Sequence, residues 1–159
     1  MKTLGAAIVK GIEVGKVVER LDGFYCYNLV VAQFSLALGN RLEGQASFLL
    51  GDELEEVAEE ALGAAKGLAN RIGELGGEVT ADPALLVERS PLSEFSLPES
   101  TSEVGVILGH VYERVRMIVG EYGAFLEEVR GRDELSHRLV LKLLAEQIER
   151  ASEIEAALT

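Results

Sequence analysis

The strongest constraint on the fold is a helical periodicity near the end of the chain, between residues 138 and 158. Its apolar positions recur every three or four residues, with Gln147 at one step of the series: Val140, Leu144, Ala151, Ile154 and Leu158. This spacing is typical of a helix that packs inside a bundle. Gln147 and Arg150 share that face, one turn apart. A polar pair in a packed face is costly unless its hydrogen bonds are satisfied, so this pair needs an explanation.

The spacing of the pair bears on metal binding. Bundles that bind two metal ions use a Glu-x-x-His pair at this spacing. This chain has Gln147, Ile148, Glu149 and Arg150 in that register. Iron prefers carboxylate oxygen and neutral imidazole, so an amide and a guanidinium are a poor ligand pair.

Composition limits the class of protein. A chain of 159 residues, 48% hydrophobic and 26% charged, is long enough for one soluble domain with a core, and we expect that domain to span residues 1–159. The net charge of −12 and the lack of a basic arm argue against a nucleic-acid partner. Cys26 allows no internal disulfide, no leader sequence is evident, and the apolar runs are too short to span a membrane. These features predict a cytoplasmic protein with no membrane partner.

Four helices are expected. The first begins near Ile12 and ends at Gly39-Asn40, and a linker of some helical character follows over residues 42–50. The second begins with Asp52 as its N-cap and ends at Gly76-Gly77. Residues 78–102 contain all 3 prolines and show no sustained period, which indicates a long connection.

The third helix follows a cap at Thr101 or Ser102, and residues 131–133 form a short turn into the fourth. Long connections in helical proteins cross the length of a bundle. The pattern therefore predicts an all-α, ferritin-like four-helix bundle with a long crossover between the second and third helices. An up-and-down bundle with an oversized loop is the alternative.

Several short fragments of this chain occur in the order and spacing of a known superfamily. They are residues 11–16 (GIEVGK), 42–46 (LEGQA), 71–77 (RIGELGG), 97–99 (LPE), 131–133 (GRD) and 145–150 (AEQIER). Through them the chain resembles the ferritin-like superfamily and, within it, the archaeal Dps-like group. In that family, a Glu on the first helix and a Glu on the third join Glu-x-x-His pairs on the second and fourth. Together these residues bind two irons and oxidise Fe(II) inside a shell of many chains.

Counting along the matched fragments carries the family's ligand positions onto other residue types. They fall on Asn28, Ala61, Ala64, Arg114, Gln147 and Arg150. A shift of one residue would move the third-helix position to Glu113 or Val115, and the periodicity favours 114 or 115. The cysteines of related Dps-like proteins fall near Ser90 and Val115. The resemblance thus implies a degenerate di-iron site, so we expect no metal or cofactor, with iron as the alternative. His110 and His137 are interpreted as surface or half-buried residues.

In place of the metal we expect a polar cluster at the bundle centre, formed by Asn28, Gln147, Arg150 and one of Glu113 or Arg114. Amide oxygens of Asn28 and Gln147, or the Glu113 carboxylate, would accept hydrogen bonds from Arg150. If Arg114 faces inward, a bound anion or an acid such as Glu146 is needed. The alternative is that Arg150 extends to solvent past the helix end.

Three functions from different classes follow. The first is a non-catalytic, homo-oligomeric structural or interaction protein, with an interface predicted from apolar residues outside the packed faces: Leu29, Phe34, Leu36 and Leu49. The second is an iron-storage, ferroxidase or peroxide-detoxifying protein that uses substitute carboxylates at Glu53, Glu56, Glu146 and Glu149. The third is a bundle that binds a small anion through Arg114, Arg150, Asn28 and Gln147.

Overall fold

The computed structural model describes residues 2–159, which form helices and irregular segments without a β-strand. Four long helices build the bundle: α2 (Val14–Gly39), α3 (Gly44–Glu74), α5 (Val104–Val129) and α6 (Glu134–Leu158). Three short helical segments accompany them: α1 (Leu4–Ala7), η1 (Pro83–Leu85) and α4 (Leu86–Arg89). Over residues 2–159, no helix is both long and apolar enough to cross a membrane. The predicted all-α fold is confirmed.

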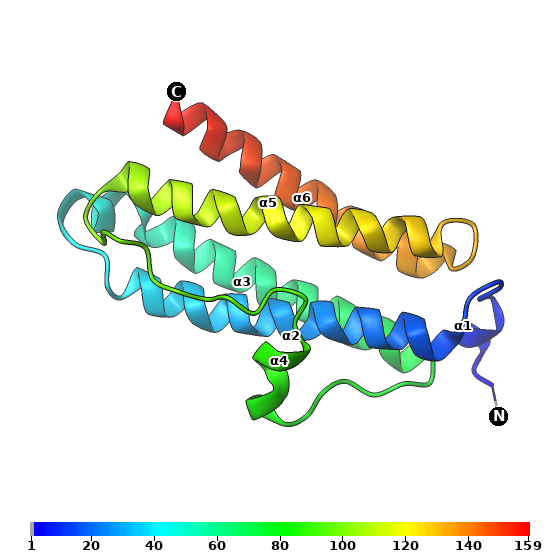
Figure 1. Ribbon diagram of the computed structural model, residues 1–159. Coiled ribbons are helices and arrows are strands. Elements are labelled where there is room, and N and C mark those ends of the chain that lie inside the picture. Colours follow the sequence, from blue (N-terminus) through cyan, green and yellow to red (C-terminus); the bar gives the residue numbers. More distant parts are fainter. Residues whose placement is uncertain (1) are drawn as a thin grey trace.

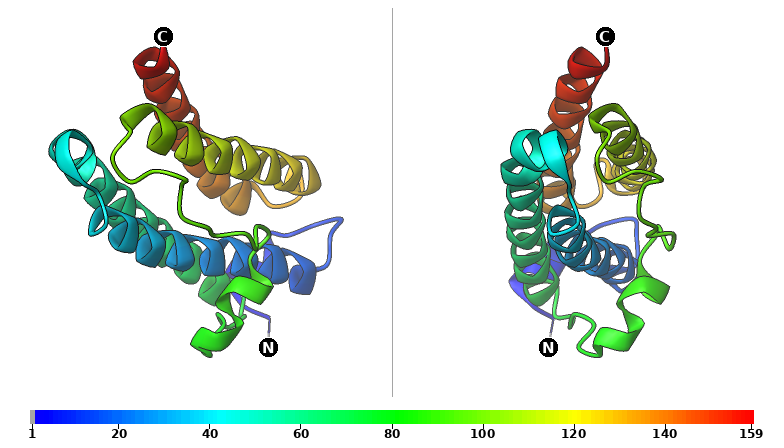
Figure 2. Two further views of the ribbon diagram at one scale, coloured as in Figure 1. Left: turned by 60° about the vertical axis from the view of Figure 1, so that its left-hand side comes forward. Right: turned by 90° about the vertical axis from the view of Figure 1, so that its left-hand side faces the viewer.

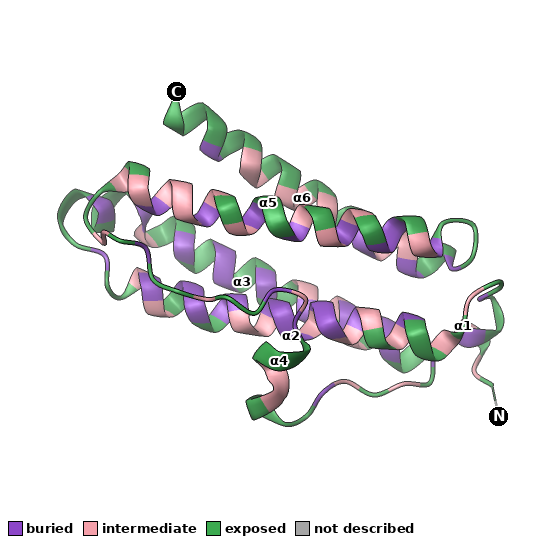
Figure 3. Cartoon of the chain, viewed as in Figure 1, coloured by how far each residue is buried: buried purple, intermediate pink, exposed green. Residues whose placement is uncertain are grey.

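The four long helices are arranged as two hairpins, α2 with α3 and α5 with α6 (Figure 1). Between α3 and α5 the chain runs back along α2 from one end of the bundle to the other, which is the predicted crossover (Figures 1 and 2). The C-terminal end of α6 diverges from the other helices (Figure 2). The purple segments of Figure 3 show that the buried faces of the long helices point toward one another.

The start of α3 differs from the prediction. The helix begins at Gly44, and Asp52 is an exposed residue inside it rather than its N-cap. Leu42, Ala46, Leu50 and Leu54 form a buried cluster with residues of α2 and α5. Burial at these positions, spaced by four residues, extends the helix beyond the local capping signal, because tertiary packing overrides local preference.

The other helix boundaries agree with the sequence to within a few residues. Asp133 caps α6 by accepting a hydrogen bond from the Ser136 N–H at 3.1 Å. The cap expected from Thr101 or Ser102 at α5 is wrong in detail. Glu103 is the N-cap without a side-chain bond, and the Ser100 Oγ accepts from the N–H groups of Ser102 and Glu103 at 3.2 and 3.0 Å.

Aromatic packing joins α2 to α5 in the core. The Phe24 ring meets the rings of Tyr122 and Phe125 edge to face, with centroids 4.8 and 5.6 Å apart. All three side chains are almost fully buried. Such pairs favour this geometry because the positive edge of one ring meets the negative face of another.

A buried ion pair ties one end of the bundle together. The Arg71 guanidinium on α3 contacts the Asp133 carboxylate at 2.8 Å and donates to Ser136 Oγ at 3.0 Å. Both charged residues are nearly solvent-free, at 3% and 0% exposure. Arg71 also donates to the Gly5 carbonyl, so this arginine links α1, α3 and the start of α6.

The crossover is anchored on α2 through Asp22. Its carboxylate accepts from the Thr80 N–H at 2.8 Å and from the Thr80 hydroxyl at 2.6 Å, while Arg89 donates to the same hydroxyl at 2.8 Å. Gly23 allows the Arg89 carbonyl to come close, since an added Cβ would lie 3.2 Å from that oxygen. These contacts fix the part of the crossover that runs beside the bundle centre.

Candidate functional site

A small cavity lies between the four long helices. Its volume is about 20 Å³, and each of the four helices contributes side chains to it. All six positions at which the resemblance places family ligands border this cavity: Asn28, Ala61, Ala64, Arg114, Gln147 and Arg150. Val115 borders it too, whereas Glu113 lies on the surface and pairs with Arg116 at 3.0 Å. Of the two residues considered for the cluster, Arg114 rather than Glu113 is therefore the one beside the cavity.

Asn28 interrupts the apolar face of α2 because its amide group is used inside the bundle. The Nδ2 group donates to the Phe24 carbonyl at 2.8 Å and to the Tyr122 hydroxyl at 3.1 Å. Both Asn28 and Tyr122 are buried, and burial raises the pKa of the Tyr122 phenol well above its usual range. Tyr122 therefore stays neutral and keeps an O–H group at the cavity.

Arg150 pairs with other acceptors than those expected from the sequence. Its guanidinium lies 2.5 Å from the Glu60 carboxylate and 3.8 Å from that of Glu53, both on α3. Within residues 2–159, Arg150 donates no hydrogen bond to Asn28, Gln147 or Glu113. The acceptors predicted for Arg150 are therefore wrong. The Arg150 side chain is only 11% exposed, which also rules out a side chain extended into solvent. The physical reason is charge, because a carboxylate is a stronger acceptor for a guanidinium than an amide.

Arg114 borders the cavity from α5. Its guanidinium carbon lies 5.7 Å from the centre of the Phe34 ring, a cation–π contact. Burial raises the pKa of Tyr27 to about 12, although the charge of Arg114 and a hydrogen bond from it work in the other direction. Arg114 makes no ion pair within residues 2–159.

Glu146 and Glu60 supply the negative charge around the cavity. Both border it, together with Arg114 and Arg150. Burial raises the pKa of the Glu146 carboxyl, with Lys142 acting in the opposite direction. With both acids ionised, two arginines face two carboxylates and the formal charges cancel. Glu146 is thus placed as expected for the acid that, as the alternative to a bound anion, accompanies an inward Arg114.

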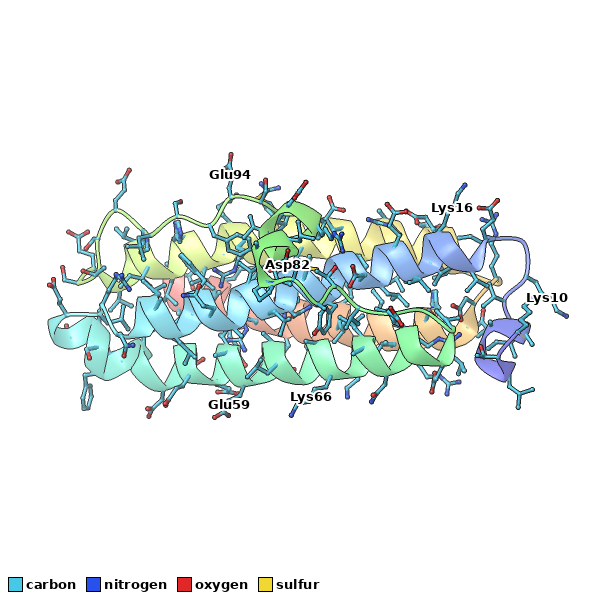
Figure 4. All side chains as sticks on the ribbon, turned by 90° about the horizontal axis from the view of Figure 1, so that it is seen from below. Lys10, Lys16, Glu59, Lys66, Asp82 and Glu94 are labelled. Atoms are coloured by element: carbon cyan, nitrogen blue, oxygen red, sulfur yellow. The ribbon has the colours of Figure 1, made fainter. Side chains whose placement is uncertain are left out.

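Outside the cavity, α3 and α6 form an acidic groove of about 140 Å³. The four glutamates proposed as substitute ligands line it: Glu53, Glu56, Glu146 and Glu149. Glu60, Glu153 and Arg150 complete its lining. Glu59 and Lys66, on the far side of α3, point away from the bundle (Figure 4). Among residues 2–159, no three His, Cys, Asp or Glu side chains converge closely enough to hold a metal ion. At the central cavity, the six family positions hold amides, arginines and alanines, which do not fit iron. Two carboxylates, Glu60 and Glu146, also border the cavity, and Glu60 is paired with Arg150.

The remaining predicted residues lie elsewhere or have other partners. His110 is half-buried under the crossover, with its Nε2 atom 2.6 Å from the Ser96 carbonyl oxygen, and His137 is half-buried near the start of α6. Ser90 is buried and donates to the Leu92 carbonyl at 2.7 Å. Phe34 is not a spare apolar residue, since it is buried and packs against Phe95 with ring centroids 6.0 Å apart.

Three residues at the site are not among those predicted from the sequence: Tyr27, Glu60 and Tyr122. A signal existed for two of them. Glu60 continues the helical series of Glu53 and Glu56 on α3, and Tyr122 lies seven residues after Val115 on the packed face of α5. Neither signal shows that Arg150 of α6 would reach across to α3.

Comparison with known proteins agrees with this geometry. The family model for ferritin, described as a ferritin-like domain, matches residues 26–159. The DNA protection during starvation protein of Pyrococcus furiosus is 28% identical over 149 residues, covering 94% of this chain and 80% of that protein.

Solved structures share the fold. The dodecameric thioferritin of Bacteroides fragilis, a bacterioferritin-related protein, superposes with a TM-score of 0.86 at 22% identity. The match covers 96% of this chain and 90% of the thioferritin chain. Dps from Staphylococcus aureus superposes with a TM-score of 0.82 at 18% identity, and the match covers 91% of this chain and 96% of that protein. The expected relationship to the ferritin-like superfamily and its Dps-like group is confirmed.

Proposed function

Because this chain belongs to the ferritin-like family, we propose that it is a Dps-like member that has lost the di-iron ligands and serves as a non-catalytic, homo-oligomeric structural or interaction protein. A cytoplasmic location is part of the proposal. Fold alone does not determine activity, and the residues around the central cavity support the proposal.

One observation carries the proposal. The six ligand positions implied by the resemblance surround one cavity, and none of them holds a carboxylate or an imidazole. Their side chains are mutually compatible without a metal, since Arg150 bridges α6 to α3 through Glu60 and Glu53. A cation entering there gains no net attraction, because the charges of Glu60 and Glu146 are already offset by Arg114 and Arg150.

Assembly is proposed from two supports. The Bacteroides fragilis relative of the same fold is dodecameric. In addition, large apolar side chains stay exposed on the single chain, above all Phe48 at 88%, with Leu36 at 48% and Leu49 at 49%. Isolated exposed apolar residues are normal, so light scattering of the purified protein at micromolar concentration is the test. A clean monomer would contradict the homo-oligomer.

Iron storage through substitute carboxylates is the second candidate, and the acidic groove between α3 and α6 is the observation in its favour. Such a run of glutamates is more often a solvated face. Stoichiometric iron retained after loading and gel filtration would favour this candidate. Its loss in a variant with Glu56→Gln and Glu149→Gln would locate the iron at the groove.

Two other partners are disfavoured by charge. A small anion gains little at the central cavity, because Glu60 and Glu146 already offset Arg114 and Arg150. Nucleic acid would meet a chain of net charge −12. A gel-shift assay at low salt is expected to show no complex.

The decisive experiment measures Fe(II) oxidation and bound metal. We expect oxidation no faster than a buffer blank and no bound iron after chelation and repurification. A ferritin with an intact ferroxidase centre provides the positive control. A catalytic rate that persists after chelation and repurification would overturn the proposed function.

A further inference from the structure

Two buried polar groups at the central cavity have unused hydrogen-bonding capacity. Asn28 is 6% exposed and uses both amide N–H bonds, toward Phe24 and Tyr122. Its Oδ1 atom accepts no hydrogen bond from any group in residues 2–159. Tyr122 is 1% exposed and accepts from Asn28, which leaves its own O–H without an acceptor in the same part of the chain. Leaving a buried donor and acceptor unpaired is costly.

The space beside these groups is an open volume rather than packed protein. The fully enclosed and unpaired side-chain atoms of the described residues are Ser35 Oγ, Asp133 Oδ2 and His137 Nε2, and Asn28 Oδ1 is not one of them. The Asn28 oxygen therefore keeps accessible surface, and the cavity that it borders is the space next to it. Tyr122 and Gln147 border the same cavity.

Size and charge together select the occupant. A cavity needs about 10–15 Å³ of free volume to hold a water molecule, and the central cavity has about 20 Å³. The two arginines and two glutamates around it cancel in formal charge, so neither an anion nor a cation is favoured. The occupant must accept from Tyr122 and donate to Asn28, which a neutral molecule with one heavy atom can do.

We propose that the central cavity binds one water molecule in the place where relatives of this fold would bind metal. The water accepts a hydrogen bond from the Tyr122 hydroxyl and donates one to Asn28 Oδ1, and thereby completes the link between α2 and α5. This inference rests on the proposed function, since it requires that no metal occupies the cavity.

The structure also indicates how this water exchanges with solvent. Arg150 is fixed by Glu60 and Glu53 on one side of the cavity. Arg114 borders both the cavity and a groove of about 400 Å³ under the crossover. Glu94 borders that groove but points away from the bundle (Figure 4), so it does not hold Arg114 in place. Arg114 makes no ion pair within residues 2–159, whereas Arg150 makes two, so we expect Arg114 to move more readily when the water exchanges.

The test combines crystallography with water relaxation dispersion on the full chain. A high-resolution crystal structure should show one peak within hydrogen-bonding distance of Asn28 Oδ1 and Tyr122 Oη. Relaxation dispersion should show a long-lived internal water, which is lost in Ala64→Leu because the larger side chain fills the cavity. Arg114→Ala should shorten its residence time. Met117→Ala, which alters the groove but not the cavity, should leave the residence time unchanged.

The outcomes separate this inference from the proposed function. Anomalous signal from manganese in the cavity after a soak would overturn both. Signal from bromide, or no density and no internal water, would overturn the water site and leave the proposed function standing. A dispersion signal that persists in Ala64→Leu would also overturn the water site, and equal residence times in Arg114→Ala and Met117→Ala would overturn the exchange route. If Ala64→Leu fails to fold, Asn28→Leu tests the same point by removing the acceptor.

Discussion

Replacing Arg150 with Ala tests whether this arginine connects α6 to α3 in place of the metal site. The change removes the guanidinium that joins α6 to Glu60 and Glu53 of α3. It also removes the aliphatic stem of a side chain that is only 11% exposed. Both losses are expected to lower the free energy of unfolding.

The magnitude follows from the exposure of the partners. A buried ion pair that loses one member costs about 3–5 kcal/mol, but Glu60 and Glu53 are 40% and 55% exposed and can be solvated. An exposed pair contributes about 0.2–1 kcal/mol. Adding lost packing of the stem, at about 0.8 kcal/mol for each buried methylene, gives an expected destabilisation of about 1–2 kcal/mol.

Two further variants separate charge from packing. Arg150→Met keeps most of the aliphatic stem. Its smaller loss in the free energy of unfolding therefore measures the Arg150–Glu60 ion pair alone, at about 0.2–1 kcal/mol. A double-mutant cycle of Arg150→Met with Glu60→Gln should give a positive coupling energy that shrinks in high salt. Urea unfolding at one fixed protomer concentration is the measurement, because assembly makes apparent stability depend on concentration.

A small effect would refute the reasoning. If Arg150→Ala changes the free energy of unfolding by less than about 0.5 kcal/mol, the usual range for a surface substitution, the arginine does not link the helices. A coupling energy of zero with Glu60→Gln would lead to the same conclusion even if Arg150→Ala were destabilising.

Three further predictions concern the rest of the chain. Asp133→Ala removes the buried carboxylate that pairs with Arg71, leaves this arginine only the exposed Glu74 as an ionic partner, and should cost about 3–5 kcal/mol in urea unfolding, while the exposed neighbour Glu134→Gln should have little effect. Thr80→Val removes the hydroxyl between Asp22 and Arg89 and should cost about 1–3 kcal/mol, with faster proteolysis of the crossover as a second readout. Because burial raises the pKa of Glu146, its ionisation destabilises the fold. That cost is absent below its ordinary value of 4.5 and develops as the pH rises through the raised pKa, so Glu146→Gln should gain stability relative to wild type over that range and not below it.

The fold was predictable because local signals and periodicity agreed over most of the chain. The crossover followed from three prolines and a missing period, and the turn at Gly131 followed from its glycine, whose φ is 72°. The start of α3 was not predictable in the same way. There, burial of Leu50 against α2 and α5 outweighed the capping preference of Asp52.

The site was only partly predictable. Helical spacing identified Asn28, Gln147 and Arg150 as polar groups on packed faces, and all three border the central cavity. The partners of Arg150 were not predictable, because pairing across two helices depends on their relative rotation and not on the spacing within either one. Glu60 lies next to Ala61 in the sequence, and a small rotation of α3 would place it on the solvent face beside Glu59.

The coupling among these residues means that reversion at one position should not restore metal binding. Arg150→His would supply an imidazole, but Ala61, Ala64, Asn28 and Gln147 would still offer no carboxylate to a metal ion. The same change removes the positive charge that faces Glu60 and Glu53, so these acids would repel one another near Glu146. We therefore expect Arg150→His to bind no iron and to unfold at lower urea concentration than wild type at neutral pH. Because a protonated imidazole would again face the glutamates, the difference should narrow below the ordinary histidine pKa of about 6.5. Iron bound stoichiometrically by this single variant would show that the other positions do not oppose the metal, contrary to the account given for the cavity.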